Sequence, residues 1–217
     1  MRRFAEWAAL ACAWLAASPA LHAAELRLQV AGPDGAPVAG LVVTVTPVSG
    51  TAPRAAPVAA VMDQIDRAFL PELQVIPTGS TVAFPNSDVI SHQVYSFSKP
   101  KRFQLPLYRG TPYPPLHFDE PGLVTVGCNI HDSMIGYILV TDAPWFGQTD
   151  AKGQWSSADI PPGEYEVHVR HPRMRELGDE LRARVNLPAS KRIEVPLTLA
   201  RALRPAPLKG PARQWDY

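Results

Sequence analysis

The chain has 217 residues, and 46% of them are hydrophobic, which is enough to fill the core of one or two domains. Its 21 Lys and Arg residues against 20 Asp and Glu residues leave a net charge of +1, so the chain has no strong positive field to hold a polyanion. This balance argues against nucleic acid as a partner. Short apolar runs separated by 24 prolines and 14 glycines predict an all-β protein.

Residues 1–24 have the three-part pattern of an export signal peptide. Arg2 and Arg3 form a basic start, residues 8–17 form a short apolar stretch, and residues 21–24 offer small side chains for cleavage. The pattern predicts a periplasmic protein without a membrane span after cleavage. A membrane anchor is the alternative, but the apolar stretch is shorter than the roughly 20 residues that span a bilayer. Lipidation of Cys12 is a second alternative, although residues 9–11 make a poor lipidation signal.

Cleavage would leave Cys128 as the one cysteine of the mature chain, because the other, Cys12, lies in the predicted signal peptide. In an oxidising compartment an unpaired thiol is a liability unless it is buried or bound to a metal. An inert, buried cysteine is therefore one interpretation. The neighbouring residues favour the other interpretation, a cysteine that binds a metal.

A thiolate, an imidazole and a thioether lie within seven residues at Cys128, His131 and Met134, between predicted strands at 123–126 and 135–140. These soft or borderline ligands prefer copper to calcium or magnesium. His92, at the start of a predicted strand that continues to residue 97, can supply a second imidazole. His117 is the rival, but it lacks a strand leading away from the metal loop.

This pattern resembles the cupredoxins, the small blue copper proteins of the plastocyanin, pseudoazurin and amicyanin group. The match includes a proline, valine, glycine and asparagine rhythm over residues 71–86, with Asn86 six residues before His92. The resemblance implies a Greek-key β-sandwich over residues 59–143 and one type 1 copper ion. It implies His92, Cys128 and His131 as strong ligands, Met134 as a weak axial ligand, and Asn86 as a supporting residue whose hydrogen bonds tie the ligand loop to a neighbouring strand.

A narrower likeness connects residues 62–64, 84–86, 94–98 and 127–132 to exported bacterial cupredoxin-like proteins labelled methylamine utilisation proteins. That label can derive from the likeness to amicyanin. We therefore carry over the copper site and leave the metabolic pathway open.

A second resemblance covers the two ends of the chain. The turn at residues 34–40 and the segment 149–165 are similar to the two motifs of the carboxypeptidase regulatory-like sandwich. The resemblance implies that residues 25–58 plus 144–199 form a second β-sandwich into which the cupredoxin is inserted; one enlarged cupredoxin is the alternative. Leu177, Leu181 and Val185 at helical spacing predict a short surface helix or an irregular loop over 173–185. Residues 200–217 are rich in proline and arginine and predict a disordered tail.

These expectations together predict a non-enzymatic electron carrier that docks transiently with a redox protein partner. A catalytic copper site needs an open coordination position, whereas four side chains fill this one. A copper-delivery protein is the alternative, although the chain shows no methionine-rich transfer arm. An adhesion or carbohydrate-binding sandwich would leave the four-ligand pattern unexplained.

Overall fold

The computed structural model describes residues 24–174, 179–189 and 191–206, and the regular secondary structure in these ranges consists of strands. The predicted all-β fold is confirmed. Residues 1–23 of the predicted signal peptide and residues 207–217 of the predicted tail lie outside the described residues. Within those ranges the structure contains no helix with the length and apolar character to cross a membrane.

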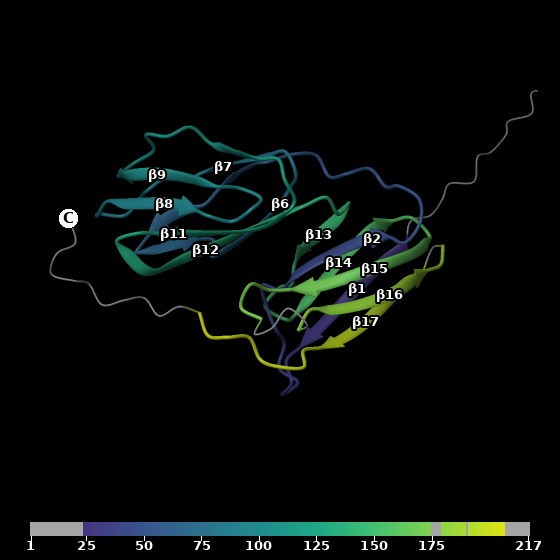
Figure 1. Ribbon diagram of the computed structural model, residues 1–217. Coiled ribbons are helices and arrows are strands. Elements are labelled where there is room, and N and C mark those ends of the chain that lie inside the picture. The colour runs from purple at the N-terminus through teal and green to yellow at the C-terminus, as the bar shows by residue number, and fades with distance from the viewer. Residues whose placement is uncertain (1–23, 175–178, 190, 207–217) are drawn as a thin grey trace, which may run out of the picture.

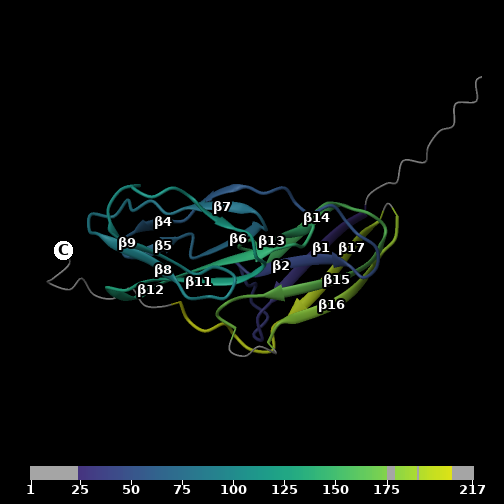
Figure 2. The same ribbon diagram turned by 45° about the horizontal axis from the view of Figure 1, so that its top comes forward.

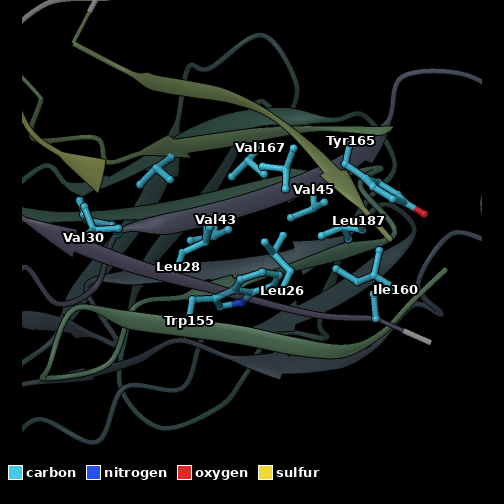
Figure 3. Close-up of a cluster of buried hydrophobic side chains, with 14 of the residues drawn as sticks. Leu26, Leu28, Val30, Val43, Val45, Trp155, Ile160, Tyr165, Val167 and Leu187 are labelled. Carbon is cyan, nitrogen blue, oxygen red and sulfur yellow. The ribbon is translucent and has the colours of Figure 1, made fainter. Parts of the chain in front are cut away.

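Strands from both ends of the described chain form two sheets that face each other (Figure 1). One sheet contains, in spatial order, β14 (Gln154–Ile160), β1 (Ala24–Ala31) and β17 (Arg192–Thr198). The other contains β13 (Trp145–Gln148), β2 (Val42–Pro47), β15 (Gly163–Arg170) and β16 (Leu181–Leu187). Alternate side chains of β1, β2 and β15 fill the core between the sheets, as Figure 3 shows for Leu28, Val43 and Val167.

Over residues 181–185 the structure corrects the helix or loop expected at 173–185, because residues 181–187 form strand β16, paired antiparallel with β15. Residues 175–178, which include Leu177, lie outside the described residues. Val185 and Leu187 are buried in the core, and Leu181 and Ala183 pack against it. Leu181 and Val185 are four residues apart, which suits either a helical turn or two steps of a strand. Because residues 181–187 pair with β15, this segment is a strand and not a helix.

The middle of the chain forms a second group of sheets. A five-stranded sheet contains, in spatial order, β6 (Leu73–Pro77), β12 (His131–Thr141), β11 (Gly122–Cys128), β8 (His92–Ser96) and β9 (Phe103–Tyr108). A three-stranded sheet contains β10 (Leu116–Phe118), β7 (Ser80–Ala83) and β3 (Ala59–Val61). The hairpin of β4 (Asp63–Ile65) and β5 (Ala68–Leu70) lies beside them (Figure 2). Their shared core includes Val82, Val94 and Val126.

The two groups of strands lie side by side in both ribbon views (Figures 1 and 2). A small buried cluster contains residues from strands of both groups: Val42, Leu73 and Leu139. In addition, Nε of Arg173 lies 3.5 Å from Oε1 of Glu72. The domain boundaries predicted above, and the carboxypeptidase regulatory-like character of 25–58 and 144–199, stay predictions.

His171 is a buried histidine just beyond β15, near this junction. The residue is only 8% exposed, and its Nδ1 accepts a hydrogen bond from the backbone N–H of Arg173 at 3.0 Å. Burial, with a smaller contribution from the charge of Arg173, lowers the pKa of His171 to about 4.

We expect acidification to destabilise the fold through this residue. The unfolded chain binds a proton at His171 near the ordinary pKa of 6.5, whereas the folded chain does so only near 4. The stabilisation is therefore present above 6.5 and is lost as the pH falls toward 4, by on the order of 2 kcal/mol. His171→Asn, whose amide oxygen can accept the Arg173 bond, should remove this part of the loss. Urea unfolding of both metal-free proteins at about pH 7 and about pH 4.5 checks it; equal losses would contradict it.

Candidate metal centre

Three potential ligands gather at one end of the five-stranded sheet. His92 is the first residue of β8, Cys128 is the last residue of β11, and His131 is the first residue of β12. Cys128 pairs with His131 across a tight turn, and the register of the two strands shifts between Gly127 and Cys128. Because β8 and β12 flank β11 in the sheet, strand pairing brings the three side chains together.

The donor atoms form a compact triangle. The Nδ1 atoms of His92 and His131 are 3.2 Å apart, and the Sγ atom of Cys128 lies 3.9 Å from the first and 3.7 Å from the second. A point equidistant from three atoms at these separations lies about 2.1 Å from each, within the range of about 2.0–2.3 Å that imidazole nitrogen and thiolate sulfur keep from a bound metal. The three residues therefore fit a metal ion without rearrangement.

Cys128 is buried, and its sulfur accepts a hydrogen bond. The residue is 2% exposed, and the backbone N–H of Gln93 donates a hydrogen bond to its sulfur at 3.5 Å. The preceding residue, Gly127, has the ring of Tyr95 so close that a Cβ atom there would lie 3.1 Å from it. The absence of a side chain at Gly127 therefore lets Tyr95 cover the strand that ends in the ligand.

Met134 is buried in the same core cluster as Cys128, whereas His117 is exposed in another sheet. Met134 is on β12, three residues after His131, and is 1% exposed in the same core cluster as Cys128. Its role as the weak axial ligand stays a prediction. His117 is exposed on β10 and pairs with Thr81 in the three-stranded sheet. Among the described His, Cys, Asp and Glu residues, the cluster able to hold a metal consists of His92, Cys128 and His131.

Asn86 braces the segment that leads into His92. Its Nδ2 donates to the carbonyl oxygens of Tyr108 at 2.7 Å and Ile90 at 3.0 Å, and its Oδ1 accepts from the N–H of Asp88 at 3.0 Å. The expected role was to tie the ligand loop to a neighbouring strand. In the structure these bonds join the segment before His92 to the end of β9, and none of those described reaches the loop from Cys128 to Met134.

We expect Asn86→Ala to destabilise both the fold and the bound metal. Three backbone groups at a residue only 3% exposed lose their partner, which costs about 2–3 kcal/mol of unfolding free energy. The metal should dissociate faster because the segment before His92 is no longer braced. Ser87→Ala is the matched control, since that exposed hydroxyl contacts only Asp63 among the described hydrogen bonds. Urea unfolding and a chelator-exchange rate measure both effects; similar results for the two variants would contradict the role of Asn86.

The sequence interpretation missed two groups behind the site. The carboxylate of Asp88 lies 3.0 Å from Nε2 of His92. Tyr108 donates its hydroxyl to the carbonyl oxygen of Phe84 and accepts from Nε2 of Gln64 at 2.6 Å; burial raises its pKa to about 12. An aspartate four residues before a predicted ligand was the available signal for the first. Tyr108 gave no local signal, because its partners are distant in the chain.

Comparison with known proteins returned similar solved structures only. No protein-family model and no curated protein matches the chain. A copper-containing nitrite reductase from Thermus scotoductus SA-01 is 27% identical over 44% of this chain and 25% of its own, with a TM-score of 0.37. The chain thus spans about a quarter of that protein.

Two further similar structures are small proteins covered almost completely. A purple cupredoxin from Nitrosopumilus maritimus is 22% identical, covering 38% of this chain and 99% of its own, with a TM-score of 0.34. A variant of amicyanin in its reduced state is 24% identical, covering 45% and 99%, with a TM-score of 0.35. These structural neighbours are cupredoxins at low identity and partial coverage.

Proposed function

We propose that this chain is a type 1 copper protein that is exported to the periplasm and carries single electrons between redox partners. The observation that carries the proposal is the triangle of two imidazole nitrogens and one cysteine sulfur, with sides of 3.2, 3.7 and 3.9 Å. Copper suits this set because thiolate and imidazole are the ligands of trigonal His2Cys electron-transfer sites, and a buried Met134 supplies the weak fourth donor. When bound, copper supplies a one-electron couple.

In such a function, the protein itself fixes the positions of the ligands and excludes water from them. His92 is fully buried and Cys128 nearly so, and each is anchored at the end of a paired strand. The same side chains can then serve both oxidation states with little movement, which keeps electron exchange fast. The proposal includes one copper ion per chain and no enzymatic turnover.

The deciding experiment is a copper(II) titration of the purified full chain, followed by visible spectroscopy and cyclic voltammetry. We expect saturation at one equivalent, an intense thiolate-to-copper absorption band and a reversible one-electron wave. Binding without that band would overturn the proposed site. Release of copper on reduction would favour a delivery protein, and reoxidation of the reduced protein by nitrite would favour an enzyme.

Electrons are proposed to leave through His131, the ligand that is least buried. Its neighbour Ile130 is 45% exposed, and Val89, next to Asp88, is 78% exposed. Such apolar groups beside a ligand suit a transient redox partner with an interface below about 1,200 Å².

We expect Ile130→Lys to slow electron exchange without changing the visible spectrum. Two copies that meet through this face would bring like charges together, which should lower the self-exchange rate by about tenfold at low salt. Val58→Lys is the matched control, because Val58 is equally exposed but its backbone N–H donates to the hydroxyl of Ser80, the first residue of β7 in the three-stranded sheet. NMR line broadening in mixtures of oxidised and reduced protein gives both rates. An equal decrease for the two variants would place the exchange on another face.

A further inference from the structure

The imidazole of His92 is contacted on both of its nitrogens. Nδ1 faces the other two ligand atoms, whereas Nε2 lies 3.0 Å from Oδ2 of Asp88. An ionised carboxylate offers only acceptors, so Nε2 must be the donor in this contact. A neutral His92 therefore carries its proton on Nε2, and the lone pair of Nδ1 is left for a metal.

The carboxylate of Asp88 is itself fixed in place. Its side chain is 8% exposed. Its Oδ2 also accepts from the backbone N–H of Arg67 at 2.8 Å, and its Oδ1 accepts from the N–H of Val89 at 2.7 Å. Both oxygens of Asp88 therefore accept from backbone N–H groups, an arrangement that suits an ionised carboxylate behind His92.

The turn between β4 and β5 delivers one of these donors. Ile65 pairs with Ala68, so Asp66 and Arg67 form a two-residue hairpin turn, and their φ angles are 52° and 55°. Such turns favour glycine or asparagine, because other side chains are uncommon at positive φ. Here the turn directs the backbone N–H of Arg67 at Asp88. A segment more than twenty residues earlier in the chain thus helps to hold the carboxylate behind the ligand.

We propose that Asp88 is a positioning residue of the copper site, which fixes the tautomer of His92 and favours Cu(II) over Cu(I). The proposal rests on the copper-binding function proposed above. A carboxylate that accepts from a ligating imidazole orients the ring and makes its free nitrogen more basic. A nearby negative charge in a poorly solvated site also stabilises the more highly charged ion. Both effects lower the reduction potential.

Asp88→Asn is the test variant, and Asp63→Asn is its matched control. Each substitution removes one negative charge with almost no change of shape. Asp63 belongs to the same group of segments, because its carboxylate accepts from the N–H of Ser87 at 3.2 Å and the hydroxyl of Ser87 at 2.8 Å. The described hydrogen bonds of Asp63 do not include His92. Thermal unfolding of the metal-free proteins establishes that both variants are folded.

We expect Asp88→Asn to weaken Cu(II) binding by about ten- to a hundredfold, with a smaller effect on Cu(I). A tenfold change in the ratio of the two affinities raises the reduction potential by about 59 mV for a one-electron couple. Asp63→Asn should change the ratio by less than about twofold, as expected for a solvent-screened charge. Equal shifts in the two variants, or no shift in either, would overturn the proposal.

A second measurement does not depend on copper. Nitrogen-15 NMR of the metal-free wild-type chain should show His92 as the tautomer protonated on Nε2, and Asp88→Asn should reduce the population of that tautomer. A wild-type ring protonated on Nδ1 would overturn the role of Asp88, whatever the copper experiments show. A wild-type protein with the expected tautomer but no thiolate-to-copper band would instead refute the proposed function and the copper preference, so the two failures are distinguishable.

Discussion

Cys128→Ala is expected to abolish the visible absorption of the copper-loaded protein and to weaken copper binding by more than about a hundredfold. Cys128 is the free cysteine of the described chain, and its sulfur is one corner of the donor triangle. Loss of a supporting residue around a metal ligand already costs about ten- to a hundredfold in affinity, so loss of a ligand should cost more. Absorption spectroscopy during a copper titration measures both effects.

The matched control for this substitution is Met134→Leu, which alters another sulfur in the same buried cluster while nearly conserving the volume of the side chain. A weak axial ligand tunes the potential of such a site but does not create its colour, so the band should persist in this variant with a changed reduction potential. A Cys128→Ala protein that keeps the same band would show that the metal is bound elsewhere. Loss of the band in Met134→Leu alone would contradict the assigned order of ligand strengths.

His92→Ala is expected to bleach the copper(II) form, whereas His117→Ala should leave the colour and the stoichiometry unchanged. The first variant removes a fully buried imidazole whose Nδ1 is a corner of the triangle. The second alters an exposed side chain on β10, in the three-stranded sheet that also contains β7 and β3. The comparison tests the choice between two histidines that the sequence left as rivals.

Addition of imidazole separates loss of the ligand from loss of the fold. His92→Ala leaves a buried space shaped for the missing ring and bordered by Asp88, so free imidazole should bind there and restore part of the band. Circular dichroism of the metal-free variant should match the wild type. If His117→Ala bleaches the protein and His92→Ala does not, the site must be moved to the rival histidine.

The structure also shows why a local pattern can mislead. Leu181 and Val185 are spaced for a helix, yet Leu181–Leu187 is strand β16, because its alternate residues face the core beside β15. A spacing of four residues fits both periodicities, and only the neighbouring strand distinguishes them.

Features that depend on neighbours along the chain could be predicted from the amino-acid sequence. Short apolar runs separated by prolines and glycines predicted the all-β fold. The spacing of Cys128, His131 and Met134 predicted a set of soft metal ligands, because a tight turn between two strands brings such residues close together. Tertiary structure places His92, and not His117, beside Cys128 and His131, because β8 pairs with β11, whereas β10 pairs with β7. Tertiary structure also revealed Asp88, held by a turn at Asp66 and Arg67 that no local pattern connects to it. The type of each side chain and the periodicity of apolar residues can be found within a short segment of sequence. The pairing of strands that are distant in the chain depends on how the whole core packs.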